Sequence, residues 1–170
     1  MSKPNSTPLT AERLRELLHY DADNGVFTRL ISSGANRAHA GDIAGGISAQ
    51  GYVYIRVDGK KYKAHRLAFL HTYGRWPTDQ IDHIDGDRAN NRIANLREAT
   101  NSENRQNLKQ SHQNNKSTLL GVSLNSKKGK FIAQISVNKR IRYLGIFPTA
   151  ELAHAAYLAA KSQLHPFSTM

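Results

Sequence analysis

Residues 81–107 of the chain read IDHIDGDRANNRIANLREATNSENRQN, and this stretch decides the local fold. The segments Ile81–Ile84 and Leu96–Ala99 predict two strands joined by a turn-rich loop. Thr100 followed three residues later by Glu103 has the form of a capping box, so a helix is expected to begin there. The predicted unit is therefore strand, loop, strand, helix.

The polar side chains of this unit include the groups that hydrolysis of a phosphodiester bond requires. Asp82 and Asn104 offer hard oxygen ligands of the kind that Mg²⁺ or Mn²⁺ binds. His83 can be neutral near pH 7, so it can take a proton from an attacking water. Neighbouring strand residues point to opposite faces, so Asp82 and His83 can share one site only where the strand ends or twists. Asp85 and Asp87 are expected to be turn residues.

The distribution of charge separates this segment from the rest of the chain, whose net charge is +11. Residues 1–78 carry 11 basic and 6 acidic side chains, residues 79–108 carry 4 and 6, and residues 109–170 carry 9 and 1. An acidic segment between basic flanks is the charge pattern expected of a cation site that faces a polyanion. The alternative interpretation is a solvated acidic turn in a basic protein.

Composition limits the architecture and the classes of site. A length of 170 residues with 39% hydrophobic content favours two small lobes over one large core. The absence of cysteine excludes disulfides, thiolate zinc sites and cysteine nucleophiles. No apolar run approaches the roughly 20 residues of a membrane span and the start is polar, so we expect a soluble, intracellular protein. The positive charge makes nucleic acid the leading partner, ahead of an acidic membrane surface, which no basic amphipathic helix supports.

The residues before this unit predict a helix, a hairpin and a second helix. Thr10 is the expected N-cap of the first helix, which carries an apolar stripe of leucines. Tyr52–Val57 and Lys60–His65, joined by Asp-Gly, predict a β-hairpin with a type I′ turn. Residues 66–73 predict the second helix, and residues 34–51 a loop or irregular strands.

Basic side chains crowd the second arm of the hairpin and the start of the helix after it: Lys60, Lys61, Lys63 and Arg66. Two interpretations of these side chains have equal weight: they contact phosphate, or they make an edge strand soluble. His65 and His71 are interpreted as packing or hydrogen-bonding histidines, because neither has an acidic neighbour in sequence.

The tail of the chain predicts a separate small module. Residues 109–117 contain no large apolar side chain and are interpreted as a polar linker. Strands are expected near 121–122, 129–137 and 140–147, with one face apolar and the other polar or basic. A helix is expected to begin at Thr149, with small side chains facing the sheet.

Three sequence blocks between about residues 64 and 107 stand in a specific order and spacing: HRLAFLHTYGRWP, then IDHIDGDRANNRIANLREAT, then NSENRQN. This stretch resembles the HNH endonucleases of phages, including free-standing homing endonucleases. The resemblance implies the ββα-metal fold, with His83 as general base and with Asp82 and Asn104 as the metal ligands.

The same resemblance implies roles for the asparagines. Asn95 would brace the loop and orient the histidine, and Asn90 and Asn91 are alternative candidates for that middle position. Asn104 stands where many relatives have the final histidine, which favours magnesium over zinc.

The blocks GVSLNSKKGKFIAQI, YLGIF and TAELAHAAYLAA, within about residues 118–165, resemble the Apetala-type, ethylene-response-factor-like DNA-binding domain. The resemblance implies a three-stranded sheet, backed by one helix, that enters the major groove. Positions that read bases in the plant family are here Leu120, Ser123, Asn125, Lys128 and Ser136, so no base preference carries over.

Candidate DNA contacts follow from these interpretations. Lysines would mainly position the protein on phosphate, whereas arginine, asparagine and glutamine could read base edges. The alternative is a basic, solvated sheet without a ligand. Besides the hairpin cations, the candidates are Arg105, Asn125, Lys128, Lys130, Gln134, Lys139, Arg140, Arg142 and Tyr143.

Together these patterns predict an α+β protein: a ββα-metal (HNH) nuclease lobe plus a small three-stranded antiparallel sheet packed on one helix. Residues 1–108 would form the nuclease lobe, with its core at 64–108, and residues 118–170 the DNA-binding module after the linker at 109–117. The expected function is a metal-dependent DNA endonuclease, a nickase or homing-type enzyme, that hydrolyses phosphodiester bonds in duplex DNA with Mg²⁺ or Mn²⁺. We expect a monomer in the cytoplasm of a phage-infected bacterium, with no membrane partner.

Two other functions stay open at the level of sequence. One is a non-catalytic DNA-binding regulator with a structural HNH-like lobe. The other is an RNA-binding or RNA-cleaving protein. The small number of exposed aromatic side chains available for base stacking argues against it.

Overall fold

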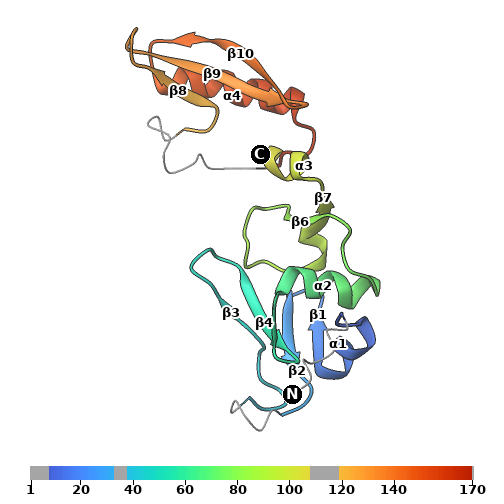
Figure 1. The fold of residues 1–170 in the computed structure, drawn as a ribbon. Coiled ribbons are helices and arrows are strands. Elements are labelled where there is room, and N and C mark those ends of the chain that lie inside the picture. The colour runs from blue at the N-terminus through green and yellow to red at the C-terminus, as the bar shows by residue number, and fades with distance from the viewer. Residues whose placement is uncertain (1–7, 33–37, 108–118, 170) are drawn as a thin grey trace, which may run out of the picture. The chain divides into compact units, whose positions relative to one another are not determined.

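The computed structural model describes residues 8–32, 38–107 and 119–169. The chain forms two compact units, Met1–Ala99 and Thr100–Met170, and each contains helices and strands (Figure 1). The mixed α and β content agrees with the expected class. In the part of the chain that is described, no helix is both long and apolar enough to cross a bilayer.

The first unit is built from short helices and antiparallel strands. Its helical elements are α1 (Ala11–Leu17), α2 (Ala64–Tyr73) and the 3₁₀ turn η1 (Ile93–Asn95). Its strands are β1 (Leu18–Asp21), β2 (Val26–Arg29), β3 (Gly46–Ile47), β4 (Val53–Val57), β5 (Lys60–Lys63), β6 (Gln80–His83) and β7 (Leu96–Ala99). They pair as β1-β2, β3-β4-β5 and β6-β7.

Local sequence explains where these elements begin and turn. The Thr10 hydroxyl accepts a hydrogen bond from the Arg13 amide at 3.2 Å, which confirms the predicted cap of α1. The β4–β5 turn has positive φ at Asp58 (45°) and Gly59 (78°), as a type I′ turn requires. The second helix begins at Ala64 rather than after His65, because the second arm of the hairpin ends at Lys63.

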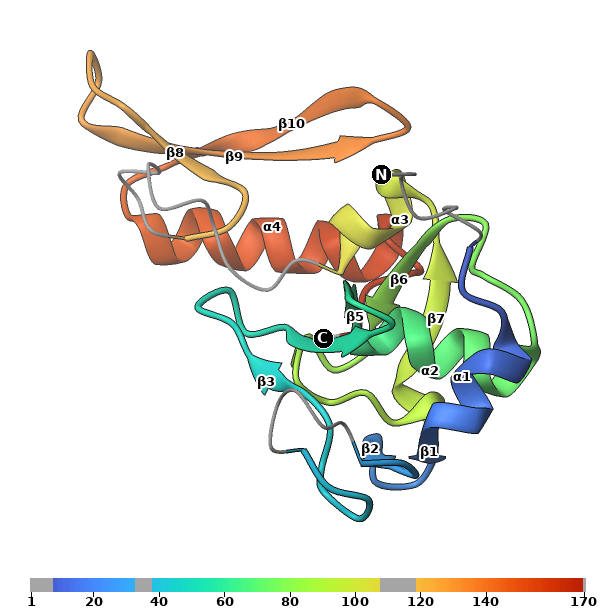
Figure 2. The ribbon, with the colours of Figure 1, turned by 60° about the horizontal axis from the view of Figure 1, so that its bottom comes forward.

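One hydrophobic core joins the N-terminal elements to the strands of residues 80–99. It includes Leu14 of α1, Leu67 of α2 and Leu96 of β7. The two helices contact each other and lie side by side in both views (Figures 1 and 2). The Trp76 indole donates a hydrogen bond to the Leu9 carbonyl at 2.9 Å. Leu9 and α1 are therefore part of the support for the later elements of the first unit.

The second unit contains α3 (Asn101–Gln106), β8 (Val122–Asn125), β9 (Lys130–Val137), β10 (Arg140–Phe147) and α4 (Ala150–Leu164). The strands form an antiparallel sheet in the order β10-β9-β8, and α4 runs along one of its faces (Figures 1 and 2). Its core contains Val122, Ala133 and Ala153. A side chain at Gly121, whose φ is 76°, would overlap the ring of Tyr157, so only glycine fits there.

Several predicted boundaries of the second unit are confirmed. Thr100 and Glu103 form the reciprocal bonds of a capping box at the start of α3, and Thr149 caps α4. Asn138 and Lys139 have positive φ, 51° and 64°, and make the tight β9–β10 connection. The predicted linker at 109–117 lies outside the described residues, so the predicted domain boundary there stays a prediction.

Candidate active site

The imidazole predicted as general base lies at the end of a strand. His83 is the last residue of β6, and only 5% of it is exposed. Its neighbour Asp82 pairs across the sheet with Arg97, whose Nε and Nη2 donate to the carboxylate Oδ2 at 3.0 and 2.9 Å. The buried carboxylate is thus held by a charged hydrogen-bonded partner, which fixes its orientation.

Two aromatic residues surround the His83 ring. The ring of His65, from the first turn of α2, packs edge-on against it, with centroids 5.0 Å apart and an interplanar angle of 82°. The Tyr52 ring lies 6.2 Å from His83 and 5.5 Å from His65. The expectation that His65 is a packing histidine is therefore met, but what it packs against is the proposed base.

Burial determines the charge of both histidines. It lowers the pKa of His83, although the contact with Asn91 and the negative charge of Asp85 offset part of the effect. It lowers the pKa of His65 to about 3, with the neighbouring His83 adding to the shift. Both rings are therefore neutral near pH 7, and a neutral imidazole can accept a proton.

The Asn91 amide faces Nε2 of the His83 ring. Asn91 Nδ2 donates to the Ala89 carbonyl at 2.9 Å, which leaves its Oδ1 facing His83 Nε2 in a long contact of 3.5 Å. An amide oxygen only accepts, so this contact favours the tautomer with hydrogen on Nε2. In that tautomer the lone pair of the ring is on Nδ1.

The loop that carries Asn91 rests on the N-terminal hairpin. The Tyr20 hydroxyl of β1 donates to the Asn91 backbone carbonyl at 2.6 Å, and both residues are buried. Gly25, between β1 and β2, approaches so closely that a side chain there would overlap the backbone of Asn91 and Arg92. Because its φ is also 71°, this position needs glycine for two independent reasons.

Asn95 braces the same loop through a different set of contacts. Its Nδ2 donates to Asp85 Oδ1 at 3.0 Å and to the Asn90 carbonyl at 2.9 Å, and its Oδ1 accepts from the Asp85 amide at 3.0 Å. Asp85 also accepts from the Asp87 amide at 2.8 Å, as expected for a turn aspartate. Asn95 therefore braces the loop, whereas Asn91 contacts the imidazole of His83.

The predicted metal ligands come from both units. Asp82 is on β6 in the first unit, and Asn104 is on α3 in the second, so their pairing on one ion stays a prediction. Within the described residues, no cluster of three or more histidine, cysteine, aspartate or glutamate side chains could hold a metal. Magnesium is commonly bound by only one or two carboxylates together with water and substrate phosphate, so one aspartate and one amide fit that ion.

A family comparison covers this same stretch. Residues 62–106 match the HNH endonuclease family model. The match, here called the HNH segment, includes His65, Asp82, His83, Asn95 and Asn104.

No curated protein matches the chain. Among solved structures, it is similar to one described as DNA binding and cleavage by the HNH homing endonuclease I-HmuI, with a TM-score of 0.40 and 21% sequence identity over 86% of this chain and 80% of that chain.

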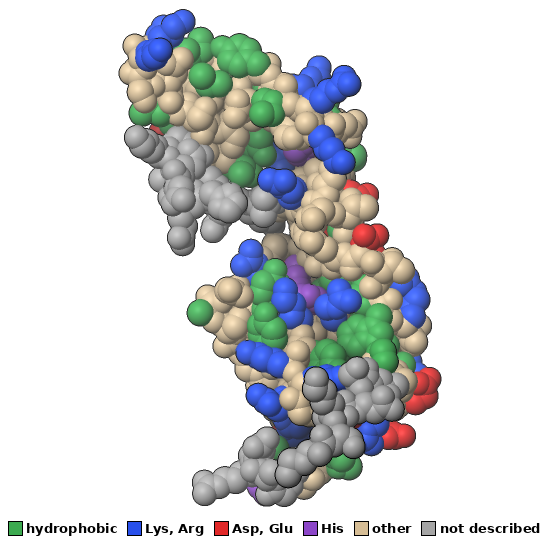
Figure 3. Space-filling model, viewed as in Figure 1, with side chains coloured by type: hydrophobic (Ala, Val, Ile, Leu, Met, Phe, Trp, Pro, Cys, Tyr) green, Lys and Arg blue, Asp and Glu red, His purple; other side chains and the backbone are tan. Residues whose placement is uncertain are grey.

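Basic side chains lie beside the HNH segment and at its start. Lys61 and Lys63 of β5 each place a nitrogen over a tyrosine ring, and Arg66 lies 5.7 Å from the Trp76 ring. Lys60 is exposed at the beginning of β5. Figure 3 shows lysine and arginine side chains near a small area of exposed histidine atoms on the first unit.

Strand pairing places the candidate contacts of the second unit on different faces. Tyr143 pairs with Gln134 and shares the open face of the sheet, whereas Arg142 pairs with Ile135, whose side chain is buried. Arg140 likewise pairs with Val137, on the side that packs on α4. The open face also receives the paired residues Asn125 and Lys130, and exposed Lys128 lies in the turn between them.

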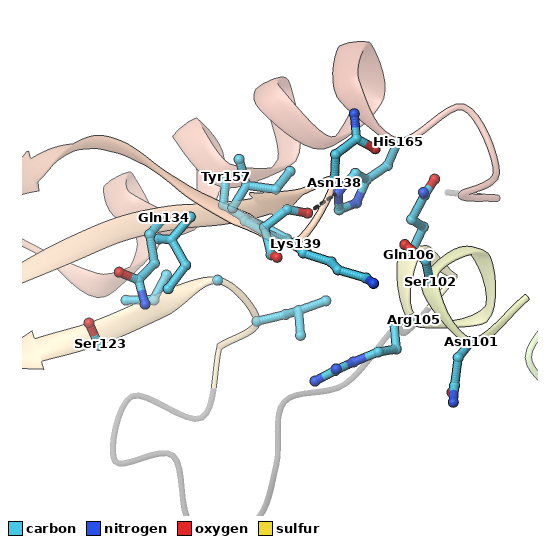
Figure 4. A pocket seen from close by; sticks show the side chains of 16 residues that line it. Asn101, Ser102, Arg105, Gln106, Ser123, Gln134, Asn138, Lys139, Tyr157 and His165 are labelled. Atoms are coloured by element: carbon cyan, nitrogen blue, oxygen red, sulfur yellow. Dashed lines mark hydrogen bonds between the residues drawn. The ribbon is translucent and has the colours of Figure 1, made fainter.

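A hollow of about 830 Å³ lies within the second unit (Figure 4). Arg105 of α3 and Lys139 of the β9–β10 turn both line it, and Figure 4 shows their side chains reaching into the same space. Two cations of the predicted DNA-binding set are therefore neighbours, although 34 residues separate them in sequence.

Sequence reasoning missed Tyr52 and Arg88. Arg88 comes from the loop after β6, and its guanidinium carbon lies 5.0 Å from the Tyr52 ring centre. The two-residue period of β4 could have placed Tyr52 on the same hairpin face as Tyr54. No local signal could have placed Arg88, because it reaches the hairpin through the fold.

Proposed function

We propose that the protein is a metal-dependent endonuclease that hydrolyses phosphodiester bonds in duplex DNA, as a nickase or a homing-type enzyme. The observation that carries the proposal is the buried, neutral His83 at the end of β6, next to Asp82 and inside the HNH segment. A histidine held neutral beside a carboxylate is suited to general-base chemistry at neutral pH.

In this mechanism His83 Nδ1 accepts a proton from water, and the water oxygen attacks phosphorus. The bond between phosphorus and the 3′ oxygen breaks, and that oxygen takes a proton from solvent. Asn91 and His65 hold the plane of the imidazole, and Asn95 keeps the loop closed beneath it. A histidine fixed in this way loses less entropy when the reacting groups align.

Asp82 and Asn104 are the proposed ligands of a divalent cation, Mg²⁺ or Mn²⁺. When bound, such an ion neutralises charge on the phosphate and on the leaving oxygen. The bond from Arg97 would keep the Asp82 carboxylate in place. Asparagine and aspartate oxygens are hard ligands, which favours magnesium over zinc.

The second unit is the proposed DNA anchor, with the ethylene-response-factor-like sheet arrangement. Residues 109–170 carry 9 basic and 1 acidic side chains, so this part attracts the DNA backbone. Joining two weak DNA contacts in one chain raises the effective concentration of each. A monomer has one site, so it would cut one strand at a time.

Nicking of supercoiled plasmid in magnesium tests the proposal. We expect wild type to convert it to the open circle and His83→Ala to lose this activity. His19→Ala removes an exposed histidine from β1 and serves as the matched control, with wild-type activity expected. Equal nicking by wild type and His83→Ala, or no nicking by wild type, would reject the nuclease function.

One observation favours a second candidate, a DNA-binding regulator with a structural HNH-like lobe. The Asp82 carboxylate is already paired with Arg97, as a structural aspartate would be. The same preparations distinguish the two functions, because a regulator would bind duplex DNA tightly and leave the plasmid intact. Preferential competition by RNA would instead favour an RNA-directed function.

A further inference from the structure

Tyrosines and lysines alternate along one face of the β4–β5 hairpin. Lys61 Nζ lies 4.4 Å from the centre of the Tyr54 ring, and Lys63 Nζ lies 4.1 Å from the centre of the Tyr52 ring. Tyr54 pairs with Lys63 across the hairpin, so these side chains share the face opposite to buried Ile55. We call these four residues the tyrosine–lysine strip.

One end of the strip reaches the proposed base. The ring of Tyr52 lies 6.2 Å from that of His83, so the last tyrosine of the strip borders the imidazole. Arg88, from the loop that follows β6, places its guanidinium 5.0 Å from the same tyrosine ring. Its Nη1 donates to the Gln50 carbonyl at 3.0 Å, which anchors the side chain. Two cations from two different elements therefore meet on one ring beside His83.

The chemistry of these contacts suits an anion. A cation over an aromatic face is attracted by the ring but keeps its full positive charge, unlike a cation paired with a carboxylate. Arg88 uses one N–H for Gln50, and its planar fork has further N–H groups that can bind two oxygens of one phosphate. Lys63 adds a compact positive charge at the same ring.

We infer that Tyr52, Lys63 and Arg88 form the subsite for the DNA phosphate that is cut, and that the rest of the strip receives the backbone leading to it. The inference rests on the proposed nuclease function and deepens it. Tyr52 acts as a positioning residue, because it holds the two cations rather than contacting the reacting atoms. The subsite binds the charge common to every phosphodiester, so it contributes no sequence preference.

Single-turnover nicking with enzyme in saturating excess over plasmid tests this subsite. Arg88→Gln and Tyr52→Leu should lower the cleavage rate by about tenfold or more, because the phosphate is no longer held for attack. Tyr52→Phe keeps the ring and should stay within about threefold of wild type. Arg13→Gln removes the same unit of charge from α1 and is the matched control.

The outcomes separate this inference from the nuclease proposal. If Arg88→Gln and Tyr52→Leu cleave at the wild-type rate at saturation, even with weaker DNA affinity, the subsite is overturned. Loss of nicking in His83→Ala would still uphold the nuclease function. A wild-type protein that does not nick would remove both. Arg88 is exposed, so its variant stays informative if Tyr52→Leu proves unfolded by circular dichroism.

Discussion

Replacing Tyr20 by phenylalanine should damage both stability and catalysis, although Tyr20 lies outside the HNH segment. The change keeps the ring, which stacks on Phe27 at 4.7 Å, and removes only the hydroxyl bonded to the Asn91 carbonyl at 2.6 Å. Both residues are buried, so the carbonyl loses its donor where water is excluded. A buried acceptor without a partner costs about 1–3 kcal/mol, which lowers the folded-to-unfolded ratio by about 5- to 150-fold.

Catalysis should fall because Asn91 also faces His83. Urea unfolding followed by circular dichroism would measure the stability, and plasmid nicking, under conditions where the protein is fully folded, would measure the rate. In a double-mutant cycle, Tyr20→Phe and Asn91→Ala should be non-additive in the nicking rate, because both act through one imidazole. Tyr73→Phe, at a residue 54% exposed, is the control. A destabilised Tyr20→Phe that nicks at the wild-type rate would refute this coupling.

Three further outcomes follow from burial, close packing and charge. Because the folded state holds the pKa of His65 at about 3, below its ordinary 6.5, the unfolded chain binds the proton first. The contribution of His65 to stability is complete above pH 6.5 and should fall by about 2 kcal/mol by about pH 5. Urea unfolding should find a smaller loss in His65→Phe, which keeps the contributions of His71 and His83, whose pKa values burial also lowers. Gly121→Ala should lower the melting temperature far more than Gly129→Ala, because the new methyl group overlaps Tyr157 at the first position and meets open space at the second, both with positive φ. Deletion of residues 109–170 should weaken DNA affinity and flatten its dependence on salt in a titration; an unchanged salt slope would remove the anchor role.

Local signals predicted the starts of three helices and one hairpin turn from the sequence, whereas strands β1 and β2 were not predicted. Threonine caps at Thr10, Thr100 and Thr149 begin three helices, and the Asp-Gly pair makes the hairpin turn with the required positive φ. These features depend on a few adjacent residues, which explains why the pattern alone sufficed. The α2 start was predicted two residues late, because Ala64 and His65 fit either a strand or a helix.

Contacts between distant segments could not be predicted in the same way. The sequence contains three asparagines in the loop. Nothing local distinguishes Asn91, which faces His83, from Asn90 and Asn95, which both donate to the Asp85 carboxylate. The choice of Asn91 depends on Tyr20, which is 71 residues away. Arg88 likewise meets Tyr52 only because the loop folds back on the hairpin.

The hydrophobic core that unites α1, α2 and β7 limits how the HNH segment could move between proteins. A graft of residues 62–106 alone would carry Leu67 and Leu96 without Leu14 of α1, which belongs to the same core, and Trp76 without the Leu9 carbonyl. The graft would also lack Tyr20, and with it the support of Asn91. A transplant able to fold in a new host would have to begin near Leu9, so recombination that preserves the fold should exchange the N-terminal hairpin and strands β6 and β7 together.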